Sequence, residues 1–169
     1  WCENHDNDQF REFLLPRGHF KSTVLTIGDS VRIVLPDDIG GSIWPRNLGT
    51  NARVCIGHEV VDTAARFLFS ISGHFLHNPR LMGFFPECIP DKRRHRINKF
   101  ELELPRTEIW NEPTFDTIGV GGASQGKHYN FLKLDDLFGD KARDSAAERR
   151  RAIDWFDNIQ SLFSTFEKD

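Results

Sequence analysis

The chain has 169 residues, a length that suits one domain with a hydrophobic core of its own. It holds 22 Lys and Arg against 25 Asp and Glu, so the formal net charge is −3. This balance excludes a uniformly basic nucleic-acid coat, and any polyanion has to meet a local basic patch. No apolar run approaches the roughly 20 residues that a membrane helix needs, and we find no cleavable signal at the start, so we expect no membrane partner.

The cysteines and the first residue give further bounds. Cys2, Cys55 and Cys88 lie far apart, with no Cys-x-x-Cys spacing. An odd, scattered set argues against a disulfide framework and against a zinc site, and it is typical of a reducing cytoplasm. The chain begins with Trp1 rather than Met. We therefore expect it to be a piece of a longer protein.

The first half of the chain alternates short apolar runs with stretches of helical periodicity. Gly28 lies inside the first helical stretch, where we expect that helix to pack close to a neighbour. Pro36 ends this helix, because proline cannot continue the hydrogen-bond pattern. The expected elements are a buried strand at 10–15, a helix at 21–35, a loop at 36–52, a strand at 53–57 and a helix at 60–76. The expected buried positions are Val24, Ile27, Val31 and Val34 in the first helix, and Val61, Ala64, Ala65, Leu68, Ile71 and Phe75 in the second.

The second half is less regular but ends in a clear helix. We expect a loop at 78–91 with a short helical turn, a hairpin strand at 100–104, strands at 114–120 and 130–134, and a helix at 145–163. Ile153, Phe156, Ile159 and Phe163 are expected on the buried side of that helix. Strands alternating with helices predict an α/β fold, with a mostly parallel sheet covered on both faces. Ligands of such folds collect at the carboxyl ends of the strands.

The turn at 16–23 joins the first expected strand to the first expected helix. A phosphate-binding loop needs backbone N–H groups at a helix start, a Lys for the β- and γ-phosphates and a hydroxyl for Mg²⁺. Lys21 and Ser22 supply the last two. The strict glycine pattern is not kept, because Leu15 and Phe20 stand at its glycine positions. The alternative is an ordinary turn in which Ser22 or Thr23 caps the helix.

A second segment with candidate functional residues is the acidic strand end at 131–136. The apolar strand finishes in Asp135 and Asp136. Paired acids at this place hold Mg²⁺ and orient the attacking water in phosphate-loop ATPases. Alternatively, the acids mark a plain turn, where Asp is common. The Lys-Ser turn and the paired acids follow one another in the order that a nucleotide site requires, and we therefore expect them to face the same triphosphate.

The segment Leu14–Thr23, LLPRGHFKST, resembles the Walker A loop of bacteriophage terminase large subunits. That loop often departs from the strict pattern and carries an Arg four residues before its Lys, as Arg17 stands before Lys21. The segments NPRLMGFFP, EPTFDTIGVGGASQGKHYNFLKLDD, with its Walker B end, and SAAERRRAIDWF follow in family order. The resemblance runs from about Leu14 to Phe156. It implies a phosphate-loop NTPase fold of the RecA-like, ASCE type.

The resemblance further implies a function. Residues 1–169 would be the N-terminal packaging-ATPase domain, without the C-terminal nuclease domain, and the coupling motif would follow Asp169. The domain would hydrolyse ATP with Mg²⁺ to drive double-stranded DNA into a procapsid in the host cytoplasm. Its partners would be the portal, the small terminase subunit and further copies in a ring.

The resemblance also implies residue roles. Lys21 would bind the β- and γ-phosphates, Asp136 would activate water, and Arg17 would contact the γ-phosphate. Ser22 and Asp135 would hold Mg²⁺. The nucleotide-binding segment would comprise Pro16, Arg17, Gly18, His19, Phe20, Lys21, Ser22 and Thr23.

Three positions depart from the family's pattern. Phe20 replaces a Gly beside the phosphate, and Asp136 replaces the Glu that most members carry. Gln125 stands where many relatives place an Arg before Gly as the finger that acts on a neighbouring subunit. Lys127 or Arg17 is an alternative finger. Gln9, upstream of the loop, is the candidate for adenine contact.

Other readings remain open. The basic run at 92–96 is either a DNA contact through Arg93, Arg94 and Arg96 or a solvated loop. Two rival functions are a helicase-like ATPase of superfamily two, which needs a second RecA-like lobe, and a degenerate nucleotide fold that only binds DNA or a partner.

Overall fold

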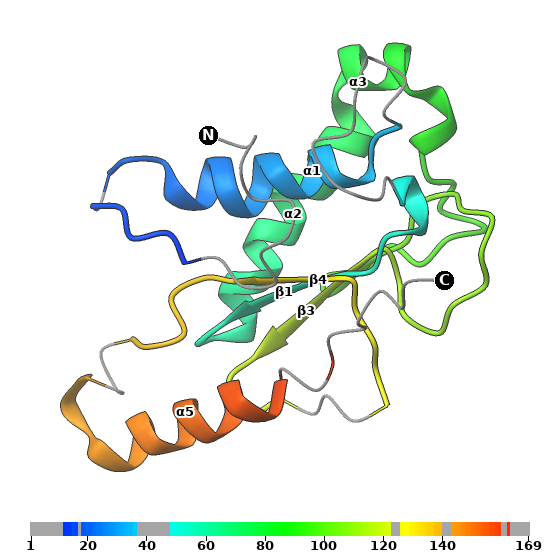
Figure 1. Ribbon diagram of the computed structural model, residues 1–169. Coiled ribbons are helices and arrows are strands. Elements are labelled where there is room, and N and C mark those ends of the chain that lie inside the picture. The colour runs from blue at the N-terminus through cyan, green and yellow to red at the C-terminus, as the bar shows by residue number, and fades with distance from the viewer. Residues whose placement is uncertain are drawn as a thin grey trace.

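In the computed structural model the described residues are 12–16, 18–36, 48–122, 126–139, 143–159 and 162. They form an α/β fold around a sheet with the strand order β2-β3-β1-β4. Figure 1 shows the first helix and α2 on one face of this sheet and α5 on the other. The expected mostly parallel sheet with helices on both faces is therefore confirmed for the described part of the chain.

The parallel strands lie where the sequence predicts them. β1 (Val54–His58) is the central strand and pairs in parallel with β3 (Phe115–Gly119) and with β4 (Phe131–Leu134). β2 (Glu101–Leu102) pairs antiparallel with β3 and is shorter than the expected strand at 100–104. The central position of β1 explains why it is almost entirely buried. In Figure 1 the arrowheads of β1 and β3 point toward the end of the sheet at which the first helix begins.

The predicted helix at 21–35 is present, but its first half is not an α-helix. A π-helical segment, η1 (Ser22–Gly28), runs directly into α1 (Asp29–Val34). The backbone N–H of Asp29 bonds to the Val24 carbonyl, five residues back. This wider turn changes which side chains face the core: Val24 is 59% exposed, whereas Thr26 is buried. The expected burial of Val24 is therefore wrong.

We expected Gly28 to mark a close approach to a neighbouring element, but no such approach is present among the described residues. A Cβ at this position would meet only the carbonyl oxygen of Thr23 among the described atoms within 4 Å, at 3.2 Å. That carbonyl belongs to the same helix and lies five residues back. The glycine therefore relieves crowding inside the π-helical turn.

The two long helices cover opposite faces of the sheet. α2 (Val61–His77) buries the predicted Ala64, Ala65, Leu68, Ile71 and Phe75. α5 (Ala146–Ile159) buries Ala152, Trp155 and Ile159, while Ile153 is 42% exposed. The expectation for Ile153 is wrong because the face of α5 that packs on the sheet is the one that carries Trp155. The expected Phe163 lies outside the described residues. Phe75 and Trp155 belong to separate core clusters.

The segment at 78–91 contains more helix than the single turn expected. α3 (Pro79–Phe84) is followed by the 3-10 turn η3 (Pro86–Cys88), and another 3-10 turn, η2 (Gly49–Asn51), precedes β1. The Asn78 side chain accepts hydrogen bonds from the backbone N–H groups of Arg80 and Leu81. Asn as the cap and Pro at the first helical position together explain why α3 begins there.

The expected buried strand at 10–15 is wrong in its described part. Residues 12–15 carry no regular structure and are exposed, with Leu14 at 84% and Leu15 at 40%. An apolar run indicates a tendency to be buried, but a strand also needs a partner edge for its backbone groups. These residues join no sheet in the described structure.

Among the described residues, none of the helices has both the length and the apolar composition that a membrane span requires.

Candidate functional site

The start of the first helix and the end of β4 meet in space. The ammonium Nζ of Lys21 lies 2.8 Å from Asp135 Oδ1 and 2.7 Å from Asp136 Oδ1. The backbone N–H of Asp135 bonds to the Gly57 carbonyl, which places the two acids at the carboxyl ends of the parallel strands. The Lys-Ser turn and the paired acids, more than a hundred residues apart in sequence, therefore form one cluster, which we call the strand-end cluster (Lys21, Ser22, Thr26, Asp135 and Asp136).

Asp135 is the buried centre of the strand-end cluster, with 3% of the residue exposed. Its Oδ2 accepts hydrogen bonds from Ser22 Oγ at 2.5 Å and from Thr26 Oγ1 at 3.3 Å. Burial alone would raise the pKa of this carboxyl, but the hydrogen bonds from Lys21 and Ser22 outweigh it and hold the pKa below its usual value. Asp135 is therefore a carboxylate that stays ionised although it is largely shielded from water.

Lys21 links the buried acid to an exposed one. Hydrogen bonds to Asp135 and then to Asp136 raise the pKa of the Lys21 ammonium. The side chain of Asp136 is 67% exposed, against 4% for that of Asp135. One cation is thus shared by two carboxylates, so the three charged groups together keep a net negative charge, and one of the two acids is open to solvent. A bound phosphate can compete for the same ammonium, since phosphate oxygens accept the same kind of charge-assisted hydrogen bond.

The backbone around the cluster adopts the left-handed conformation at three places. Gly18 has φ +83°, Phe20 has φ +55° and Asp136 has φ +44°. This region suits glycine and costs other residues about 1–2 kcal/mol. Phe20 therefore stands at a position whose backbone favours glycine. Its side chain is 73% exposed and points into solvent.

The remaining residues of the predicted binding segment are only partly placed. Pro16, Gly18 and His19, just before the helix, and Thr23, in its first turn, are exposed. Arg17, Gln125 and Gln9, which the sequence singles out, lie outside the described residues. Their predicted roles have no structural account.

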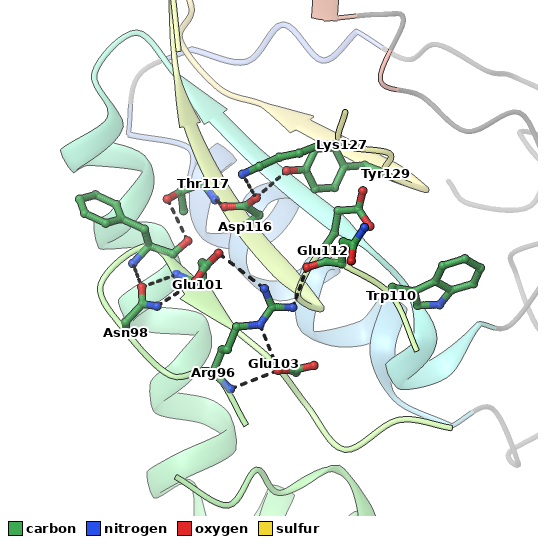
Figure 2. Close-up of polar contacts among 12 residues, drawn as sticks. Arg96, Asn98, Glu101, Glu103, Trp110, Glu112, Asp116, Thr117, Lys127 and Tyr129 are labelled. Atoms are coloured by element: carbon green, nitrogen blue, oxygen red, sulfur yellow. Dashed lines mark hydrogen bonds and ion pairs between the residues drawn. The ribbon is translucent and has the colours of Figure 1, made fainter. Parts of the chain in front are cut away.

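Lys127 belongs to a different cluster. Its Nζ lies 2.7 Å from Asp116 Oδ2, and the hydroxyl of Tyr129 donates to the same oxygen at 2.5 Å (Figure 2). Thr117 donates its backbone N–H to Asp116 Oδ1 at 2.8 Å. We call these residues the mid-strand cluster (Asp116, Thr117, Lys127 and Tyr129). Asp116 is level with Cys55 in the sheet, whereas Asp135 lies just beyond Gly57. The two clusters are thus about three residues, roughly 10 Å, apart along the strands.

Sequence reasoning missed Asp116 and Tyr129. Asp116 is 3% exposed inside β3, and Tyr129 is 1% exposed in the core cluster of Trp155. Burial is the main cause that raises the pKa of the Tyr129 hydroxyl, and electrostatic interactions with Cys55 and Asp116 raise this pKa further. The available signal was one acid in the otherwise uncharged run FDTIGV, because a buried charge needs a partner.

The basic run divides into structural and exposed residues. Arg96 donates from Nε to Glu103 Oε2 at 3.2 Å and from Nη2 to the Asn111 carbonyl at 2.8 Å (Figure 2). The side chain of Arg94 is 82% exposed, with its Nε 3.8 Å from Asp91 Oδ2, and Arg93 is also exposed. The Arg96 guanidinium therefore holds the segments around β2 together, while Arg93 and Arg94 face solvent.

The donor set at the strand ends fits Mg²⁺ with a nucleotide. Ser22 and Asp135 offer a hydroxyl and a carboxylate, and Mg²⁺ commonly takes one or two protein oxygens together with phosphate oxygens. Within the described ranges, no three His, Cys, Asp or Glu side chains are placed to hold a metal by themselves. A metal here would therefore depend on oxygens from a phosphate ligand.

Comparison with known proteins adds no family. The chain matches no protein-family model and no curated protein sequence. The interpretation of the strand-end cluster rests on its geometry and on the motifs described above.

Proposed function

We propose that this chain is a Mg²⁺-dependent ATPase of the phosphate-loop NTPase class, and that it serves as the packaging-motor domain of a viral terminase large subunit. The observation that carries the ATPase proposal is the contact of Lys21 with both Asp135 and Asp136, with Ser22 on the same buried carboxylate. A cation, a hydroxyl and two acids at the carboxyl ends of parallel strands, beside a helix start, are the groups that triphosphate hydrolysis needs.

Each residue has a part in this proposal. Lys21 releases the carboxylates and binds the β- and γ-phosphates. Ser22 and Asp135 hold Mg²⁺, which supplies positive charge against the phosphate oxygens. Asp136, the exposed acid, orients and deprotonates the attacking water once Lys21 has moved to phosphate. Catalysis would consist of positioning and charge stabilisation, as in other phosphoryl-transfer sites.

The terminase part rests on the resemblance of LLPRGHFKST and of the segment that ends in Asp136. Double-stranded DNA, the portal, the small terminase subunit and a ring of identical chains in the host cytoplasm are the corresponding partners and setting. Lys127 remains a candidate for the finger of a neighbouring subunit, and using it so would require its release from Asp116. A superfamily-two helicase-like ATPase would use the same strand-end chemistry, and strand separation would reveal it.

A second candidate is a nucleotide fold that binds DNA or a partner without hydrolysis. The observation that favours it is the short Lys21–Asp136 contact, which ties the acid needed to activate water to the ammonium. The strained Phe20 backbone, where glycine would fit, points the same way.

The test is ATP turnover and nucleotide binding by the 169-residue chain. We expect Lys21→Ala to lose both and Asp136→Asn to lose turnover while it retains binding, because Asn keeps the shape and tolerates a positive φ. Binding of a non-hydrolysable ATP analogue without any turnover would favour the second candidate. Turnover that survives both substitutions would contradict the assignment of ATP hydrolysis to the strand-end cluster.

A further inference from the structure

The buried carboxylate of Asp135 receives a hydroxyl that the phosphate-loop pattern does not include. Thr26 is 5% exposed and lies four residues after Ser22 in η1. Its Oγ1 donates to Asp135 Oδ2 at 3.3 Å, the same oxygen that accepts from Ser22 at 2.5 Å. Residues four apart share one face of a helix, so both hydroxyls reach the end of β4 from the same side.

This contact is unusual for a threonine inside a helix. Such hydroxyls commonly bond to the carbonyl four residues back in their own helix. Thr26 instead reaches across to another element, from a buried position that lies outside the apolar repeat of the first helix. A buried hydroxyl without a partner costs free energy, and Asp135 supplies the partner here. The π-helical phase of η1, which exposes Val24, is what turns Thr26 toward Asp135.

The two oxygens of Asp135 therefore have separate tasks. Oδ1 contacts Lys21, at 2.8 Å, whereas Oδ2 accepts from the two hydroxyls. Lys21 and Ser22 are the groups that a nucleotide and its metal would engage. Thr26 lies further along the helix, and it contacts the carboxylate directly rather than through either of them.

We propose that Thr26 is a positioning residue, which fixes the orientation of the Asp135 carboxylate so that this acid and Ser22 can hold Mg²⁺ together. The inference rests on the proposed function, because it assumes that a Mg²⁺–nucleotide occupies the strand-end cluster. Thr26 itself touches neither metal nor nucleotide and acts through Asp135.

The test combines two readouts on Thr26→Val, which has the same shape without the hydroxyl, and Thr26→Ser, which restores the hydroxyl. The first readout is a double-mutant cycle with Asp135→Asn, measured by urea unfolding without nucleotide. We expect Thr26→Val to lower stability less in the Asp135→Asn background than in the parent. The second readout is the Mg²⁺ concentration at half-maximal binding of a non-hydrolysable ATP analogue. We expect Thr26→Val to raise it about tenfold, to leave Mg²⁺-free nucleotide binding within about twofold, and Thr26→Ser to restore it.

The outcomes separate this inference from the proposed function. Additive stability effects would overturn the Thr26–Asp135 contact. Coupling in the cycle together with an unchanged Mg²⁺ midpoint would reduce Thr26 to a structural residue and overturn the positioning role. A parent chain that binds no nucleotide at any Mg²⁺ concentration would overturn the proposed function and this inference together, whereas a failure confined to Thr26→Val leaves the proposed function standing.

Discussion

The strand-end cluster and the mid-strand cluster are built from the same chemical parts. In each, an aspartate that is 3% exposed accepts from a lysine ammonium, at 2.8 or 2.7 Å, and from a hydroxyl at 2.5 Å. They differ in what surrounds these parts. At the strand ends Lys21 also contacts the exposed Asp136, whereas in the mid-strand cluster the hydroxyl belongs to the core residue Tyr129.

The comparison indicates that a cluster's position along the strands decides whether it can meet a ligand. Ligands of α/β sheets collect at the carboxyl ends of the strands, where Lys21 and the two acids lie. Asp116 is the second residue of β3 and is enclosed by Tyr129 and Thr117. We therefore expect the strand-end cluster to serve a ligand and the mid-strand cluster to serve stability, and the next two experiments test that contrast.

The largest expected difference is in nucleotide affinity. Lys21→Ala should weaken binding of a non-hydrolysable ATP analogue by about a hundredfold, because it removes the cation that faces the phosphates. Lys127→Ala, which removes the matching cation of the mid-strand cluster, should change the affinity by less than about twofold in the isolated domain. Isothermal calorimetry at fixed Mg²⁺ measures both. Equal losses in the two variants would end the assignment of separate roles.

The opposite order is expected for stability. Tyr129→Phe should lower the free energy of unfolding by about 2 kcal/mol, because it leaves buried Asp116 with one fewer donor. Ser22→Ala should cost about 1 kcal/mol or less, since Asp135 keeps Lys21 and Thr26. Urea unfolding gives both values. A Ser22 variant that is the less stable of the two would mean that the strand-end cluster is a structural centre.

Acid should weaken the contacts around β2 through Glu103. Burial would raise the pKa of Glu103, but hydrogen bonds from Arg96 and the charge of Arg106 outweigh it and lower the pKa below its ordinary 4.5. A lowered pKa means that ionised Glu103 stabilises the fold above about pH 4.5, and that this contribution is lost as the pH falls through the lower folded value. Glu103→Gln should therefore show a smaller decrease in stability between about pH 5 and pH 3. Parallel pH curves for the variant and the parent would show that the ion pair contributes nothing.

The smallest effects concern DNA. Arg93→Gln and Arg94→Gln should each reduce the salt slope of DNA binding by about 1 if the basic run contacts phosphates. Arg96→Gln should instead lower thermal stability, because its guanidinium holds Glu103 and the Asn111 carbonyl. Fluorescence anisotropy over a range of salt concentrations gives the salt slopes, and thermal unfolding gives the stability of the Arg96 variant. An unchanged slope for Arg93 and Arg94 would assign the run to a solvated loop.

Sequence periodicity predicted the elements whose burial follows one simple repeat. α2 was predicted with its buried Leu68 and Phe75 because a regular α-helix against a sheet fixes which residues face inward. The first helix was located correctly, but the π-helical turn altered its phase and Thr26 went unnoticed. Residues 12–15 were misjudged because an apolar run says nothing about whether a partner strand is present.

The candidate site shows the same division. The contact of Lys21 with Asp135 and Asp136 could be expected from motif order, since a helix start and a parallel strand end meet at one edge of the sheet. The Asp116–Tyr129 contact could not, because Tyr129 precedes β4, and β1 separates β4 from β3 in the sheet. The sequence spacing of the two residues does not predict such a contact.

The backbone of Phe20 has a practical consequence for engineering. Its φ of +55° is expensive for phenylalanine, and the ring gains little from packing because it is 73% exposed. Glycine would remove the conformational cost at the expense of added freedom in the unfolded chain, for a net gain of up to about 1 kcal/mol. We therefore expect Phe20→Gly to raise the thermal stability of this domain. The same substitution removes an exposed apolar ring from its surface, which favours solubility.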